Sequence, residues 1–234
     1  LQDLLKLPKP PMQIECFDNS NISGQDAVAA CVVFRMGKPS KKDYRKYNIK
    51  TVEGPDDYAS MKEVVRRRYS RMIKEETPLP DLIITDGGRG QMEVVRQVIE
   101  DELQLNIAIG GLAKDNKHRT HELLFGFPPQ TIGCKPNSPL FLLLTHIQDE
   151  VHRFAITFHR EKRSKRQIAS EIDNIKGIGP KNKQLLLKHF HSVIRMQEAT
   201  QDELQNVVGD KKAQLIYEYF HPNTSNSENS NHED

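Results

Sequence analysis

LIITDGGRGQ, Leu82 to Gln91, is the stretch that decides the fold of this 234-residue chain. Its first four residues form an apolar run that ends in threonine, which is typical of a short strand buried on both faces of a sheet. Asp86 follows directly, and then come two glycines, an arginine and a third glycine. A metal-binding carboxylate at a strand end, a phosphate loop and a simple turn are the open interpretations. The stretch lacks the Lys-Ser/Thr ending of a P-loop and the spacing of the dinucleotide fingerprint, which argues against a phosphate loop.

The segments around this stretch predict a mixed α/β sheet flanked by helices. Three strand-like segments come first, and the short polar connections between them favour an antiparallel meander. Amphipathic helices then alternate with apolar strands, as in parallel α/β arrangements. The expected strands are 12–17, 26–37, 44–50, 81–85, 106–113 and 123–127, and the expected helices are 54–76, 89–103 and one long helix within 138–169.

The pattern changes between Ile172 and Phe220. A Gly-Ile-Gly turn separates a short helix from a second helix, and Pro180 stands where that second helix begins. The same pattern of two helices joined by a turn occurs once more, and there Thr200 and Glu203 have the spacing of a capping box. We therefore expect a small all-α domain made of two helix-hairpin-helix units in tandem.

These changes divide the chain into five expected parts. The first residues read as the end of a helix that runs into prolines, which suggests a piece cut from a longer protein. The last residues have no apolar side chain and are rich in Asn and Ser, which is typical of disorder. The parts are a leader remnant at 1–11, the α/β domain at 12–160, a basic linker at 161–170, the hairpin domain at 171–220 and a disordered tail at 221–234.

Composition limits the class of protein without naming a partner. The 34 basic and 32 acidic residues nearly balance. The segment from Arg160 to Lys188, however, contains nine Lys or Arg and only three acids. This excess of positive charge either attracts polyanions or forms the solvated side of a helix. Three widely spaced cysteines indicate neither a disulfide framework nor a zinc site, and they fit a reducing cytoplasm. No apolar run approaches the roughly 18 residues of a membrane span, and the start lacks a signal-peptide pattern.

Asp18, Asp86 and His152 are the candidates for chemistry in the α/β domain. The two aspartates follow predicted strands, and ligands gather beyond the carboxyl ends of strands in open α/β sheets. Such carboxylates could share Mg²⁺ or Mn²⁺, which prefer oxygen ligands, and two ions would stabilise an in-line displacement at phosphorus. A histidine nearby could ligate an ion or transfer a proton. Taken singly, each aspartate also fits a turn or cap, and His152 also fits a surface pair.

The order of these features resembles a known fold and a known family. A first-strand aspartate, a meander, a second strand-end aspartate and a histidine on a late helix resemble the ribonuclease H-like fold. Six ordered stretches are similar to the C-terminal half of the excinuclease ABC component C family, over about residues 11–220. They are IECFDNSNISG, GPDDYASMKEVVRRRY, LIITDGGRGQ, GLAKD, DEVHRFAITFHR and IKGIGPKNKQLLLKHF.

This resemblance implies a divalent-metal-dependent DNA endonuclease that makes the 5′ incision beside a lesion in bacterial nucleotide excision repair. Asp18, Asp86 and His152 would be its catalytic and metal-binding set. Asp57 matches a further acid of the family, although Asp56 is adjacent and both suit the first turn of a helix. The implied partners are double-stranded DNA carrying a lesion and excinuclease component B. The family's nuclease domain for the 3′ cut and its segment for binding component B lie outside the resemblance, so we do not expect dual incision from this chain alone.

The first hairpin, KGIGPK, is the expected contact with the DNA backbone. Main-chain N–H groups at a helix start form an anion site, and such contacts hold a duplex without reading its sequence. The second hairpin departs from this pattern, because Val207 stands where the first has Gly177, and a β-branched residue resists positive φ. The expected DNA contacts are Gly177, Ile178, Gly179, Lys181, Lys183, Gly209, Lys211, Arg66 and Arg67.

Alternatives stay open on sequence alone. Arg66 and Arg67 fit the wet side of an amphipathic helix as well as they fit a DNA channel. Asp149, three residues before His152, could orient the imidazole or simply be solvated. The whole chain could also be another ribonuclease H-like nuclease, such as a junction resolvase, or a non-catalytic DNA-binding scaffold.

Overall fold

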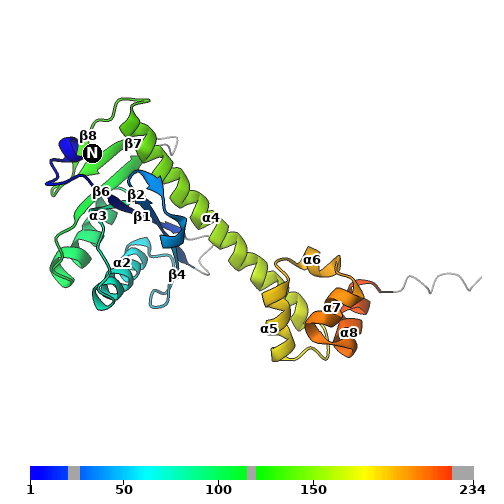
Figure 1. Ribbon diagram of the computed structural model, residues 1–234. Helices are drawn as coiled ribbons and strands as arrows, with labels where there is room; N and C mark the ends of the chain where they lie inside the picture. Colours follow the sequence, from blue (N-terminus) through cyan, green and yellow to red (C-terminus); the bar gives the residue numbers. More distant parts are fainter. Residues whose placement is uncertain (21–26, 115–119, 223–234) are drawn as a thin grey trace, which may run out of the picture. The chain divides into compact units, whose positions relative to one another are not determined.

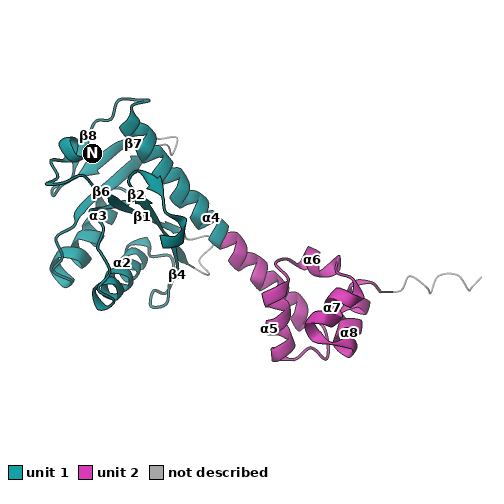
Figure 2. Ribbon diagram, viewed as in Figure 1, with its two compact units in different colours: residues 1–158 teal, residues 159–234 magenta. Residues whose placement is uncertain are grey.

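The computed structural model describes residues 1–20, 27–114 and 120–222. The chain divides into two compact units, Leu1–Phe158 and His159–Asp234 (Figure 2). Each unit has its own hydrophobic core, so the two are described separately. Most of the predicted tail at 221–234 lies outside the described residues.

An eight-stranded mixed sheet forms the centre of the first unit (Figure 1). Its order is β3-β2-β1-β5-β6-β7-β8, and β4 also pairs with β2. The predicted meander is confirmed, since β1 pairs antiparallel with β2 and β2 with β4, whereas β1, β5 and β6 are parallel. The strands are β1 Gln13–Ser20, β2 Val28–Arg35, β3 Lys38–Pro39, β4 Arg45–Asn48, β5 Leu82–Thr85, β6 Ala108–Lys114, β7 Thr120–Phe125 and β8 Gln130–Ile132.

Three main helices surround this sheet. α2 (Asp57–Lys74) contacts β1 and β2, and α3 (Arg89–Arg96) contacts β5 and β6 before it continues as the π-helical turn η2 (Gln97–Glu102). α4 (Pro139–Asp173) contributes a row of apolar side chains to the same core. In the described part of the chain, no helix combines the length and apolar character that crossing a bilayer requires.

The side chains of β1 identify the two faces of the sheet. Phe17 stacks edge-on against Tyr69 of α2, with ring centroids 6.2 Å apart. The next residue, Asp18, contacts His152 of α4 instead. Because successive side chains of a strand point to opposite faces, α2 and α4 cover opposite faces of the sheet.

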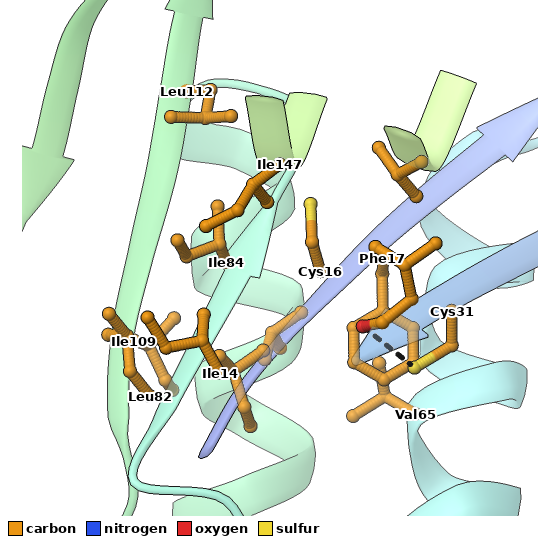
Figure 3. Close-up of a cluster of buried hydrophobic side chains, with 14 of the residues drawn as sticks. Ile14, Cys16, Phe17, Cys31, Val65, Leu82, Ile84, Ile109, Leu112 and Ile147 are labelled. Atoms are coloured by element: carbon orange, nitrogen blue, oxygen red, sulfur yellow. Dashed lines mark hydrogen bonds between the residues drawn. The ribbon is translucent and has the colours of Figure 1, made fainter. Parts of the chain in front are cut away.

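The apolar core of the first unit covers both faces of the sheet (Figure 3). Cys16 of β1 is paired in register with Ile84 of β5, and Ile147 of α4 is buried in the same cluster. All three side chains are fully buried. Burying one aliphatic side chain contributes about 1.5–3 kcal/mol to folding. This packing therefore fixes the register of β1 against β5 directly before the residues that follow the paired segment.

Over residues 159–222, the second unit contains five helical segments around a separate core. The end of α4 leads into α5, with Pro180 in its first turn as predicted. The capping box is also confirmed, because Thr200 and Glu203 exchange both hydrogen bonds. The helices after α4 are α5 Pro180–His189, α6 Val193–Gln197, α7 Gln201–Val208 and α8 Asp210–Phe220.

Two segments differ from the expected division. Residues 161–170, the expected basic linker, lie within α4, since no Gly or Pro interrupts the chain between Leu140 and Asp173. The expected leader remnant belongs to the first unit, where α1 (Gln2–Leu5) buries Leu5 to 4 % exposure in the core.

Candidate active site and DNA-binding hairpins

The parallel pairing of β1 with β5 brings Asp18 and Asp86 side by side. The paired register ends at Phe17 and Thr85, and each aspartate is the next residue in the chain. The N–H of Asp86 donates to the carbonyl of Phe17 at 2.9 Å, which fixes the two main chains together. Asp18 lies inside β1 and not at its end, because β2 continues to pair with β1 as far as Ser20.

His152 of α4 lies between the two carboxylates. Its Nδ1 is 3.0 Å from Asp18 Oδ2, and its Nε2 is 2.9 Å from Asp86 Oδ2. One ligand atom from each of the three residues lies within 4.8 Å of the others. The three residues selected from the sequence therefore converge, although they are far apart in the chain.

The two carboxylates control the protonation of His152. Hydrogen bonds to Asp18 and to Asp86 raise the pKa of His152 to about 10, while burial acts in the opposite direction. At neutral pH the imidazole is therefore protonated, and both ring nitrogens donate.

Gln148 is a neighbour of the site that the sequence analysis missed. Its Nε2 donates to Asp86 Oδ1 at 2.7 Å, and the residue is only 4 % exposed. Asp149, which the sequence suggested as a partner for the imidazole, is exposed. The four-residue spacing of Gln148 and His152 was the available signal, since such residues share one face of a helix.

Gly87 and Gly111 allow close packing beside Asp86. A Cβ on Gly111 would lie 2.7 Å from the carbonyl oxygen of Gly87, and a Cβ on Gly87 would lie 2.3 Å from Gln91 Oε1. Gly87 is not among the positive-φ glycines. The close approach therefore requires the glycine at 111, which faces main-chain atoms, whereas the end of the flexible Gln91 side chain could move away from a Cβ on Gly87.

Asp57 lies at the start of α2 and outside the three-residue cluster. The helix is capped by Asp56, whose side chain accepts from the N–H of Ala59 at 2.9 Å. The carbonyl of Asp57 accepts from Asn19 Nδ2 at 2.7 Å, which ties this helix start to the residue after Asp18. The main chain of Asp57 is thus near the site, and its exposed carboxylate fits the helix-start interpretation.

The donors at the site fit a hard divalent cation. Two carboxylates and one imidazole are ligands that Mg²⁺ and Mn²⁺ accept. Two further amide oxygens, Asn19 Oδ1 and Gln91 Oε1, are buried and have no hydrogen-bond partner among the described residues. Asn19 follows Asp18 in β1, so its side chain lies on the α2 face of the sheet, where its Nδ2 donates to the carbonyl of Asp57, and Gln91 Oε1 lies against Gly87.

Arg66 and Arg67 of α2 are engaged in contacts within the first unit. Arg66 forms a two-bond pair with Glu102, at 2.7 and 2.9 Å. Arg67 donates to Glu63 at 2.7 Å and to the carbonyl of Asn48 at 2.8 Å. These contacts favour the amphipathic-helix interpretation of the arginines, and their contact with DNA stays a prediction.

The first hairpin joins α4 to α5 through residues 174–179. Gly177 has φ of +91°, which only glycine adopts readily. α5 begins after Gly179 without a side-chain cap, so the first N–H groups of the helix have no intrahelical partner. Lys181 is exposed beside them, whereas Lys183 pairs with Asp173 at 2.5 Å.

The second hairpin is tighter than the first. Only Gly209, with φ of +80°, separates α7 from α8, and Val207 is helical. Lys211 is exposed, but Lys212 donates to the carbonyl of Gly177 at 2.5 Å. The second hairpin therefore supports the main chain of the first, and its difference in geometry agrees with the departure seen in the sequence.

The first unit is a ribonuclease H-like domain, because its mixed sheet carries two aspartates near the ends of its parallel strands and a histidine beside them. The second unit, with its paired helical hairpins, is a helix-hairpin-helix domain. The family follows from comparison with known proteins. The chain belongs to the family described as the UvrC RNAse H endonuclease domain, which matches residues 2–156. Residues 174–228 match the helix-hairpin-helix motif.

Similar full-length proteins carry the name UvrABC system protein C. The protein from Bacteroides thetaiotaomicron is 74 % identical over 216 residues, which are 92 % of this chain and 36 % of that protein. The protein from Streptococcus sanguinis is 55 % identical over 229 residues, or 97 % of this chain and 37 % of that protein. The chain thus spans little more than a third of the length of these curated relatives. Among solved structures, human ENDOV is similar at 10 % identity and a TM-score of 0.39, with 70 % of this chain and 91 % of that one covered.

Proposed function

We propose that this chain is the part of a nucleotide excision repair nuclease that makes the 5′ incision in damaged DNA, with the help of a divalent cation. The observation that carries the proposal is the convergence of Asp18, Asp86 and His152 at one end of the sheet. The name of its relatives, UvrABC system protein C, supports the repair context.

The three residues have distinct surroundings, which suggest distinct roles. The side chain of Asp86 is 0 % exposed and that of Asp18 is 10 % exposed, so both would act as rigidly held cation ligands. His152 is 39 % exposed and marks the side of the site that is open to substrate. It would supply the third donor after losing one ring proton. A bound Mg²⁺ or Mn²⁺ would polarise a phosphoryl oxygen and activate water.

The hairpin domain would hold the DNA backbone. The uncapped start of α5 after Gly179 presents main-chain N–H groups of the kind that bind phosphate. Lys181 adds an exposed positive charge next to them. These contacts are independent of base sequence, as a repair nuclease requires, because lesions arise at any sequence. We also propose excinuclease component B as the protein partner of the full-length protein.

Incision of nicked, lesion-bearing DNA by the loaded repair complex tests this proposal. Asp18→Asn and Asp86→Asn should abolish the 5′ cut and leave DNA binding within a few-fold of wild type. Asp149→Asn is the matched control, because Asp149 is an exposed acid on the same helix as His152. Retained cutting in either aspartate variant would contradict the proposal.

The same assay separates the alternative functions. Cutting of four-way DNA junctions without any loading partner would favour a junction resolvase. DNA binding that is insensitive to Asp18, Asp86 and Mg²⁺, with no cutting under any condition, would favour a non-catalytic scaffold.

A further inference from the structure

Gln148 is a buried polar side chain at the site to which the proposed function gives no role. It lies on α4, four residues before His152, and is 4 % exposed. Its Nε2 donates to Asp86 Oδ1 at 2.7 Å. A buried hydrogen-bond partner of a metal-binding carboxylate commonly tunes the affinity of the site.

The two oxygens of Asp86 have different partners. Oδ1 accepts from Gln148, and Oδ2 is 2.9 Å from His152 Nε2. The main chain of Asp86 is already fixed by its N–H bond to the carbonyl of Phe17. Rotation of the carboxylate about its terminal torsion is broad and two-fold when nothing holds it. The bond from Gln148 therefore helps to fix the plane of the carboxylate, with one oxygen toward Gln148 and the other toward His152.

The amide is suited to this task by its charge. A neutral donor orders the carboxylate and leaves its negative charge available, whereas a Lys or Arg at this position would compete with a cation. Because the side chain of Asp86 is 0 % exposed, solvent has little access to replace a lost donor.

We propose that Gln148 is a positioning residue, which holds Asp86 Oδ2 toward the space that Asp86 shares with Asp18 and His152 and thereby sets the affinity for a divalent cation. This inference rests on the proposed function, since it requires a cation at this site. The competing interpretation is a core amide that only satisfies its own hydrogen bonds. On that interpretation its loss alters stability but leaves cation affinity unchanged.

Titration of the metal-free, intact chain with Mn²⁺, followed by the electron paramagnetic resonance signal of free Mn²⁺, distinguishes these interpretations. Gln148→Met keeps the length of the side chain and removes the donor, and we expect about 10–100-fold weaker binding. Thr145→Val is the matched control. Thr145 lies three residues before Gln148 on α4, and its buried Oγ1 has no partner among the described residues, so we expect unchanged affinity. Thermal unfolding without metal is recorded for every variant.

Unchanged Mn²⁺ affinity in Gln148→Met would overturn the inference. Gln148→Asn, whose amide is one methylene shorter, is the second variant if Gln148→Met does not fold, and it should also bind Mn²⁺ more weakly. Asp86→Asn distinguishes failure of the proposed cation site from failure of the positioning role of Gln148. If it binds Mn²⁺ like wild type, the proposed cation site fails. If it loses Mn²⁺ while Gln148→Met does not, only the positioning role fails. A wild-type chain that takes up no Mn²⁺ would overturn both.

Discussion

Glu63 of α2 links the stability of the first unit to pH. The residue is 6 % exposed and accepts hydrogen bonds from the N–H groups of Lys50 and Thr51, from the Thr51 hydroxyl and from Arg67. Burial acts to raise the pKa of Glu63, but the hydrogen bonds from Thr51 and Lys50 outweigh it and hold the pKa at about 2. The carboxylate therefore stabilises the folded state when it is charged.

The sign and size of this contribution follow from the two pKa values. The ordinary pKa of 4.5 lies above the folded value, so the stabilisation is fully present above pH 4.5 and is lost as pH falls toward 2. The difference corresponds to about 3 kcal/mol. Glu63→Gln should lower the free energy of unfolding of the first unit by about 2–3 kcal/mol at pH 7, and by much less at pH 3.

Urea unfolding of the intact chain, followed by the NMR methyl signals of Val64 and Val65, measures this effect in the first unit alone. Glu75→Gln is the matched control on the same helix, because the pair of Glu75 with Arg71 is exposed and is worth at most about 0.5 kcal/mol. If Glu63→Gln destabilises the first unit no more than the control does at pH 7, or equally at both pH values, the charged Glu63 carboxylate does not stabilise the fold.

Two further changes test the buried ion pair and the hairpin contact. Arg68→Met leaves the fully buried carboxylate of Glu15 without its ion-pair partner and should cost about 3–5 kcal/mol in urea unfolding; a loss below about 1 kcal/mol would contradict this. Lys212→Met removes the donor to the Gly177 carbonyl and should weaken duplex DNA binding about 3–10-fold, with little change in salt dependence. Lys211→Met should instead lower the slope of log affinity against log salt by about one. Fluorescence anisotropy measures both slopes. Equal slopes for the two variants would count against the supporting role of Lys212.

The predicted site depended on topology and on the family resemblance. The apolar run before Asp86 and the strand before Asp18 both predicted aspartates near the carboxyl ends of strands. The two residues do meet at the carboxyl ends of the paired strands β1 and β5. His152 was selected from its motif within a long helix, and the helix does pass across that edge.

What the sequence could not supply was the set of contacts made by neighbours in space. The residue of α4 that supports the site is the buried Gln148, which donates to Asp86, and not the exposed Asp149, because the burial of one helix face depends on how α4 packs against the sheet. The sequence left Arg66 open for contact with DNA, but its guanidinium pairs with Glu102, which is 36 residues away in the chain. Likewise, residues 161–170 looked like a linker because they are basic, although their composition is equally compatible with the helix that they form.

Anomalous diffraction from crystals soaked in Mn²⁺ tests whether Asp18, Asp86 and His152 hold a divalent cation. We expect a manganese peak within ligand distance of carboxylate oxygens from both aspartates, with His152 turned to the same ion or released from its bridging position. A peak elsewhere with none at these residues, in crystals that have taken up Mn²⁺, would contradict it.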